Sequence, residues 1–186
     1  DGFESGFFVD PTTDGLDIDN LRHDDQGATA LVLNPKDGSW SFIDIPYQDA
    51  AHEIEIVAID LQIHKDGSAT AMADIKLKGF EASVLRRAFR NRDVAQKLYQ
   101  NITAYLFPGA TLITGENQNV ENILSPLNIR IKIDASTSVH HSKENVRVDL
   151  PFLFPLSGVL QLSGRQFDLI LGKGCYLMMR LVIVTF

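Results

Sequence analysis

The sequence contains a single cysteine, Cys175, among 186 residues, so no internal disulfide is possible and thiol usage does not indicate a redox compartment. It also has no polybasic run, because 17 basic residues against 24 acidic ones leave a formal net charge of -7. Nucleic-acid binding depends on clustered Lys and Arg that neutralise phosphates. A nucleic-acid partner is therefore not expected.

Long hydrophobic runs are absent too. The two most apolar stretches, 148–162 and 176–186, fall short of the roughly 20 residues that a membrane-spanning helix needs. Prolines interrupt the first and Arg180 lies in the second, so both favour buried strands rather than a membrane span. The chain begins at Asp1 without a basic-then-apolar leader, which predicts no signal peptide within this stretch.

The chain does contain enough apolar residues, 45%, to bury a core, and most of them follow strand-like patterns. Pro35-Lys36-Asp37-Gly38 and Lys65-Asp66-Gly67 are turn signals, and each predicts a hairpin between the runs on its two sides. In the run 52–64, Ile54 alternates with Glu53, with a slip near Val57. Strands are predicted at 3–9, 28–34, 40–45, 52–64, 68–77, 111–115, 127–135, 144–150, 153–162, 167–171 and 176–186.

In one segment the spacing of the apolar residues changes from that of a strand to that of a helix. Between Glu81 and Leu106 the apolar residues recur every three or four positions, which predicts a helix that ends at Pro108-Gly109. Asp93 is a plausible N-cap and would divide the segment into two helices. The sequence thus predicts a mainly β fold, a β-sandwich with one long helical insertion at about residues 81–106.

A family resemblance starts near the N-terminus. Phe7-Phe8-Val9-Asp10-Pro11-Thr12-Thr13, followed by Gln26-Gly27 and the aliphatic run 28–33, resembles the end of the bacterial transglutaminase-like core. The Asp-Gly-Ser-Ala turn at 66–69, then Gly79 and a helix with Leu85-Arg86, resembles the region after that core in multidomain members. These pieces cover about two thirds of the chain.

The resemblance implies a papain-like Cys-His-Asp triad in which Asp10 is the third member and orients the His. In that family the Cys and the His lie N-terminal to the Asp-Pro-Thr turn, and the nine residues before Asp10 contain neither. The chain alone is therefore expected to be no enzyme. The alternative for Asp10 is a plain Asp-Pro turn former.

The resemblance also suggests an organisation in which residues 1–46 are the end of the transglutaminase-like core or a linking hairpin, and 47–186 form an accessory β-sandwich domain. The implied function is a non-catalytic domain that supports the core or places a protein substrate, with the upstream core of the same polypeptide as partner. A periplasmic or extracellular location is favoured. The alternative is a free-standing protein-binding or adhesion module, and exposed edge strands would allow a homo-oligomer.

Other candidate groups are interpreted as structural. Cys175 at the start of an apolar strand is expected to be a small buried hydrophobe rather than a nucleophile. His140 and His141 would point to opposite faces of a strand, and the acidic segment 10–25 lacks the order of a calcium loop, so no metal or cofactor site is predicted. The arginines between 86 and 92 predict a solvated helix face.

Overall fold

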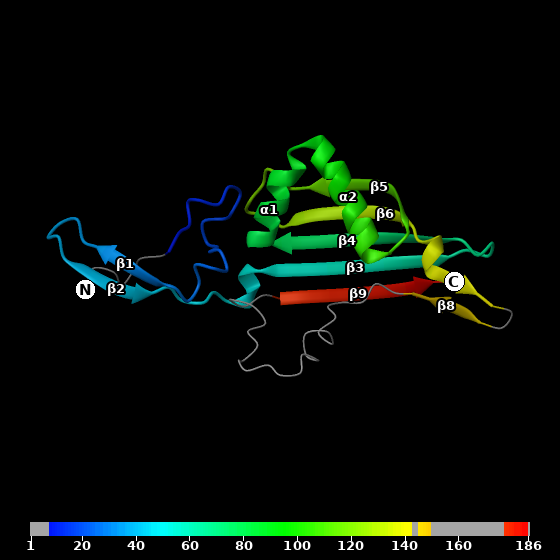
Figure 1. Cartoon of the computed structure of the whole chain (residues 1–186), viewed down its shortest axis with the longest axis horizontal. Helices are drawn as coiled ribbons and strands as arrows, with labels where there is room; N and C mark the ends of the chain where they lie inside the picture. The colour runs from blue at the N-terminus through cyan, green and yellow to red at the C-terminus, as the bar shows by residue number, and fades with distance from the viewer. Residues whose placement is uncertain (1–7, 143–144, 150–176, 186) are drawn as a thin grey trace, which may run out of the picture.

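The computed structural model describes residues 8–142, 145–149 and 177–185 of the chain. Its centre is a five-stranded sheet in the order β5-β6-β4-β3-β9. Two helices, α1 (Phe80–Phe89) and α2 (Arg92–Leu106), lie on one face of this sheet. A separate hairpin of β1 (Thr29–Leu33) and β2 (Trp40–Asp44) lies at one end of the molecule (Figure 1).

The middle of the sheet is the hairpin of β3 (Ile54–Ile63) and β4 (Ala69–Lys78), whose antiparallel ladder runs from the Ile54–Lys78 pair to the Ile63–Ala69 pair. The turn between them contains Gly67, whose φ of 87° lies in the left-handed region that glycine adopts without strain. The Asp66 carboxylate accepts hydrogen bonds from the amide and hydroxyl of Ser68. The Lys-Asp-Gly turn predicted from sequence is therefore confirmed.

The remaining strands of the sheet come from distant parts of the chain. β6 (Leu127–Asp134) pairs with β4, and β5 (Thr111–Gln118) pairs with β6, both antiparallel, with a register shift between Leu112 and Thr114. β9 (Leu177–Thr185) lies parallel to β3 on the other side. Two 3₁₀ turns, 50–52 and 136–138, and the short pair β7 (Val139–His141) and β8 (Val146–Val148) complete the described elements.

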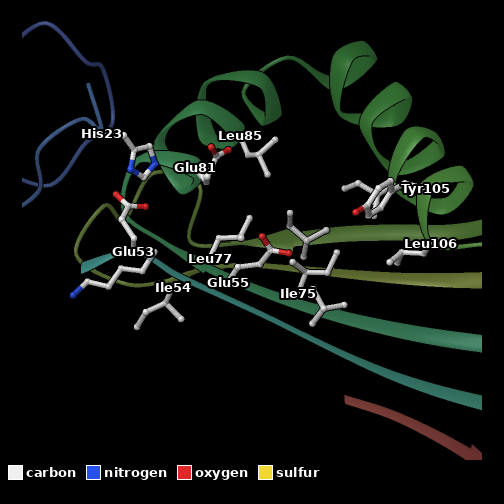
Figure 2. A pocket seen from close by; sticks show the side chains of 14 residues that line it. His23, Glu53, Ile54, Glu55, Ile75, Leu77, Glu81, Leu85, Tyr105 and Leu106 are labelled. Atoms are coloured by element: carbon white, nitrogen blue, oxygen red, sulfur yellow. The ribbon is translucent and has the colours of Figure 1, made fainter. Parts of the chain in front are cut away.

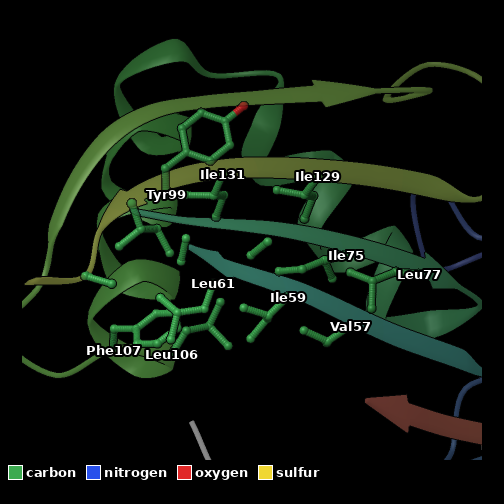
Figure 3. Close-up of a cluster of buried hydrophobic side chains, with 14 of the residues drawn as sticks. Val57, Ile59, Leu61, Ile75, Leu77, Tyr99, Leu106, Phe107, Ile129 and Ile131 are labelled. Atoms are coloured by element: carbon green, nitrogen blue, oxygen red, sulfur yellow. The ribbon is translucent and has the colours of Figure 1, made fainter. Parts of the chain in front are cut away.

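Strict alternation along the strands produces the core. On β3 the side chains of Val57, Ile59, Leu61 and Ile63 are buried, while Asp60 and Gln62 are exposed on the opposite face. β4 and β6 repeat the pattern, with alanines on β4 opposite isoleucines on β6, so that the helices approach the sheet closely. Figure 3 shows this layer with Phe107 and Leu106 closing one end. Full burial of each such aliphatic side chain contributes about 1.5–3 kcal/mol.

The helical segment is two helices, as the division near residue 93 predicted. The cap, however, is Asn91 rather than Asp93: its side-chain oxygen accepts hydrogen bonds from the backbone amides of Asp93 and Val94. Asp93 lies in the first turn, where its negative charge interacts favourably with the helix dipole.

Arg86 corrects the prediction of a solvated arginine face. Only 2% of Arg86 is exposed, and its guanidinium donates to the carbonyl oxygens of Asn119, Asn122 and Ser125 at 3.3, 3.3 and 2.5 Å. These carbonyls belong to the loop between β5 and β6, so the buried cation ties α1 to that loop. Arg87 is exposed, as the prediction required.

The expected mainly β fold with a helical insertion is confirmed, and its sheets are consistent with a β-sandwich-like arrangement. The strands predicted around 28–34, 40–45, 52–64, 68–77 and 127–135 are all present. β5 continues to Gln118, beyond its predicted end, and the short β7 was not predicted. The strands predicted at 153–162 and 167–171 lie outside the described residues.

Replacing Arg86 tests whether its hydrogen bonds to the loop between β5 and β6 stabilise the fold. Arg86→Ala removes the charged donor that bonds to the carbonyl oxygens of Asn119, Asn122 and Ser125, and we expect it to lower the free energy of unfolding by about 2–4 kcal/mol. Arg87→Ala on the same turn removes an exposed cation and should change it by less than about 0.5 kcal/mol. Urea unfolding followed by circular dichroism measures both. Equal values for the two variants would show that the hydrogen bonds of Arg86 contribute nothing to stability.

Candidate functional site

Asp10, the residue assigned to a triad by resemblance, lies in a tight local turn. Its Oδ1 accepts from the Thr12 amide at 2.8 Å and the Thr12 hydroxyl at 2.5 Å, and its Oδ2 accepts from the Thr13 hydroxyl at 2.8 Å. The Thr12 hydroxyl, more than any other contact, lowers the pKa of Asp10, and the Arg22 guanidinium at 4.0 Å lowers it further. The carboxylate is thus held ionised and rigid.

The other groups weighed in the sequence are placed apart from one another. Cys175 lies outside the described residues. His140 bonds to Asp149 at 2.8 Å, and His141 bonds to the Gly67 carbonyl at 3.1 Å, so the two imidazoles serve different partners. Asp14, from the acidic segment, forms a 2.6 Å ion pair with Arg90 and fastens that segment to the end of α1.

Within the described ranges, no group of three or more His, Cys, Asp and Glu side chains is positioned to hold a metal ion. Over the same residues, no helix combines the length and the apolar character that crossing a bilayer would require.

A cleft of about 370 Å³ opens between the helices and the sheet. Its floor is formed by apolar side chains of β3, β4 and β6, and its walls by α1 and α2, which diverge from each other above the sheet (Figure 2). The aliphatic lining residues are Ile54, Val57, Ile75, Leu77, Leu85, Ile102, Leu106 and Ile129. A concave, mostly apolar site with a few polar groups is the usual form of a small-molecule site.

Three of the six polar residues that line the cleft are glutamates. Glu53, Glu55 and Glu81 line it, together with Lys78, His23 and Tyr105. Glu53 and Glu55 face the helices because they share the alternation of Val57 and Ile59 along the strand. The sequence pattern contained this alternation, but the apparent slip near Val57 concealed that both carboxylates lie on the buried face.

Glu53 also has a structural contact. It is 3% exposed, and its Oε1 accepts a 2.7 Å hydrogen bond from the amide of Phe80, the first residue of α1. The residue before that helix, Gly79, offers no side chain for capping. Glu53 therefore supplies the N-terminal acceptor from another element, at the end of the helix where negative charge is favourable.

The surroundings of Glu53 set its protonation. Burial raises the pKa of Glu53 above its ordinary value of 4.5, and the hydrogen bond from Phe80 opposes this shift. Among neighbouring charges, His23 and His52 lower the pKa and Glu81 raises it. The His23 ring packs edge-on against Phe80 with centroids 5.5 Å apart, which places it beside the same helix end.

A second feature is the apolar face of the β1–β2 hairpin. Leu31 pairs with Phe42 and Leu33 with Trp40, so these four side chains share one face, with exposures of 55, 64, 65 and 64% respectively. The Trp40 and Phe42 rings make an edge-to-face contact at 5.7 Å. A solitary two-stranded hairpin is at best marginally stable in water, and clustered exposed aromatics mark interaction surfaces.

The Glu53→Gln variant tests the raised pKa of Glu53 through the pH dependence of the free energy of unfolding. Folding raises the pKa of Glu53. The side chain therefore adds to the free energy of unfolding below the ordinary pKa of 4.5, and this contribution is lost as pH rises through the pKa of the folded state. Glutamine keeps an acceptor for Phe80 but cannot ionise. The stability of the wild type relative to Glu53→Gln should therefore fall as pH rises from about 4 to about 7. Unfolding curves that stay parallel over this range would contradict the assignment.

Gly79→Ala tests the contact between Glu53 and the helix start. Gly79 has φ 87°, and an added Cβ would lie 2.4 Å from the Glu53 carboxyl carbon. Gly38 has φ 74° and nothing within 4 Å of the same position, so Gly38→Ala gives the cost of a side chain at positive φ without a steric contact. We expect a loss of about 1 kcal/mol for Gly38→Ala and about 2–4 kcal/mol for Gly79→Ala in denaturant unfolding. Similar losses would show that Glu53 moves aside freely.

Comparison of the chain with protein-family models, with curated proteins and with solved structures finds no match.

Proposed function

We propose that this chain is a non-catalytic accessory domain of a transglutaminase-like, Cys-His-Asp protein, and that it supports the core or places a protein substrate. The observation that carries the proposal is the β1–β2 hairpin, whose exposed Leu, Trp and Phe side chains form a surface suited to a protein partner. The partner we propose is the upstream core of the same polypeptide. The hairpin belongs to the segment 1–46 that resembles the end of that core.

The geometry of Asp10 supports a triad role in the full-length parent. An orienting carboxylate must be ionised and fixed, and Asp10 is both. Among the described residues Oδ1 already accepts two hydrogen bonds and Oδ2 accepts one, so Oδ2 is the oxygen with room for an imidazole N–H. The Cys and the His would come from upstream of Asp10.

Side-chain hydrogen bonds close the base of the hairpin. The Gln26 side chain donates to the Leu21 carbonyl and accepts from the Gln48 amide, and Gln48 in turn accepts from the Leu21 amide. These reciprocal bonds clamp the loop before β1 to the segment after β2.

The second candidate function is a free-standing protein-binding or adhesion module, and the same exposed hairpin face favours it. A homo-oligomer through sheet edges is a further form of this alternative, since β5 and β9 are the outer strands of the main sheet. The upstream sequence of the native gene product separates the candidates. A Cys and a His before Asp10 support the accessory domain, and a native protein that starts near Asp1 supports the free module.

The hairpin face can be tested by binding. The separately expressed upstream core should bind this chain, and Trp40→Ser with Phe42→Ser should weaken binding at least about tenfold, because buried aromatic anchors carry most of an interface's free energy. Ile113→Ser is the matched control, since Ile113 is 48% exposed on β5 and outside the hairpin. It should bind like the wild type in isothermal titration calorimetry. No binding by the wild-type chain, or equal binding by the double variant, would remove the support for this proposal.

A further inference from the structure

One face of the β1–β2 hairpin is apolar and exposed to water. Leu31, Leu33, Trp40 and Phe42 lie on it, and each of them is more than half exposed. Together they present roughly 500 Å² of apolar surface, near the upper end of the range for the largest patch on a typical monomer. A two-stranded hairpin needs further strands or a packed layer to be stable. This face therefore requires a covering layer.

The position of the charged residues favours a protein layer over a lipid bilayer. The apolar side chains lie along the flat face of the two strands, whereas the turn at the tip carries the exposed charges of Lys36 and Asp37. Insertion of the tip into a bilayer would bury both charges, which is strongly unfavourable. On the apolar face itself the ionisable group is Asp44, at the base, where its carboxylate accepts a 2.9 Å hydrogen bond from the Thr29 hydroxyl.

The hairpin is placed so that a second copy can reach it. It projects from one end of the molecule, and its turn lies at the far end from the five-stranded sheet (Figure 1). A two-fold axis between two such faces, perpendicular to the strands, would pack the hairpins antiparallel and leave the two main sheets at opposite ends. In a two-fold contact the same patch serves both copies, and an apolar face without a free charge is complementary to itself.

We propose that two copies of this chain form a dimer by packing their exposed hairpin faces against each other. The contact would bury roughly 1,000 Å² in total, at the low end for a specific interface, so we expect a reversible dimer with a dissociation constant on the order of 10 μM. This inference rests on the proposed function in taking the face as a protein-binding surface, and it adds a form of regulation. The second copy covers the face until the upstream core displaces it.

The chain contains its own reporter for this contact, because Trp40 is its single tryptophan. Over a concentration series from about 1 to about 200 μM, sedimentation velocity should show the mass doubling. The Trp40 emission maximum should move to shorter wavelength with the same midpoint, since the indole leaves water. Added NaCl should tighten the dimer by screening the repulsion between two chains that each carry a net charge of -7.

Three variants locate the contact. Leu33→Asp places a carboxylate from each copy in the interface and should weaken the dimer at least about tenfold while keeping the Trp40 reporter. Ser41→Asp adds the same charge to the opposite face of the same hairpin, because Ser41 pairs with Val32, and should dimerise like the wild type. Ile113→Asp changes an exposed residue of the outer strand β5 and should also dimerise like the wild type. Circular dichroism checks that each variant is folded.

Several outcomes would overturn the dimer. A wild-type chain that stays monomeric at about 200 μM, with unchanged Trp40 emission, rules it out whatever the variants do. Loss of the dimer in Ile113→Asp but not in Leu33→Asp would assign the contact to the sheet edge. A monomer whose Trp40 emission shifts on phosphatidylcholine vesicles would assign the face to a membrane.

The upstream core separates this inference from the proposed function. Titration of the core should convert the dimer into a one-to-one complex, because both partners use the same face. Core binding by a chain that is always monomeric overturns the dimer alone. A dimer that the core does not bind overturns the proposed function alone, and a core bound to an intact dimer overturns the shared face.

Discussion

The arrangement of helices over the sheet depends on one contact at the junction of β4 and α1, where the Glu53 carboxylate accepts the first amide of α1. The chain leaves the sheet at Gly79 with a backbone that a side chain would strain, and Glu53 occupies the space beside it. A glycine at the cap position leaves helix amides without an acceptor, and Glu53, directly before β3, supplies one. The direction in which α1 departs is thus set by a residue 27 positions earlier.

That contact also explains why a buried carboxylate is tolerated directly before β3. An isolated buried charge is strongly unfavourable, but here the helix N-terminus offers an amide donor and a favourable dipole. The pKa of Glu53 is nevertheless raised, because a single hydrogen bond does not offset its burial. Glu53 therefore has two effects: it fixes the start of α1, and it places a carboxyl group at one end of the adjoining cleft. The same residue links the fold to the chemistry of the site.

Much of the fold follows from local signals in the sequence. The Lys-Asp-Gly turn with alternating flanks specified β3 and β4, and the change to a three- and four-residue period specified the helices. The second half of β5 was missed because Glu116, Asn117 and Gln118 have low strand propensity, and their pairing with β6 decides their conformation. The burial of Arg86 has no local signal, since its partners are carbonyls 33 to 39 residues further along the chain.

The candidate sites were harder to derive than the fold, for a related reason. Glu53 and Glu55 show the alternation of a strand, but only the helix layer makes their face an interior one. Likewise Leu31, Leu33, Trp40 and Phe42 have the pattern of a buried hairpin face, and the structure shows that face exposed. In both cases periodicity gives the side on which a residue lies, whereas the layer packed against that side decides what it does.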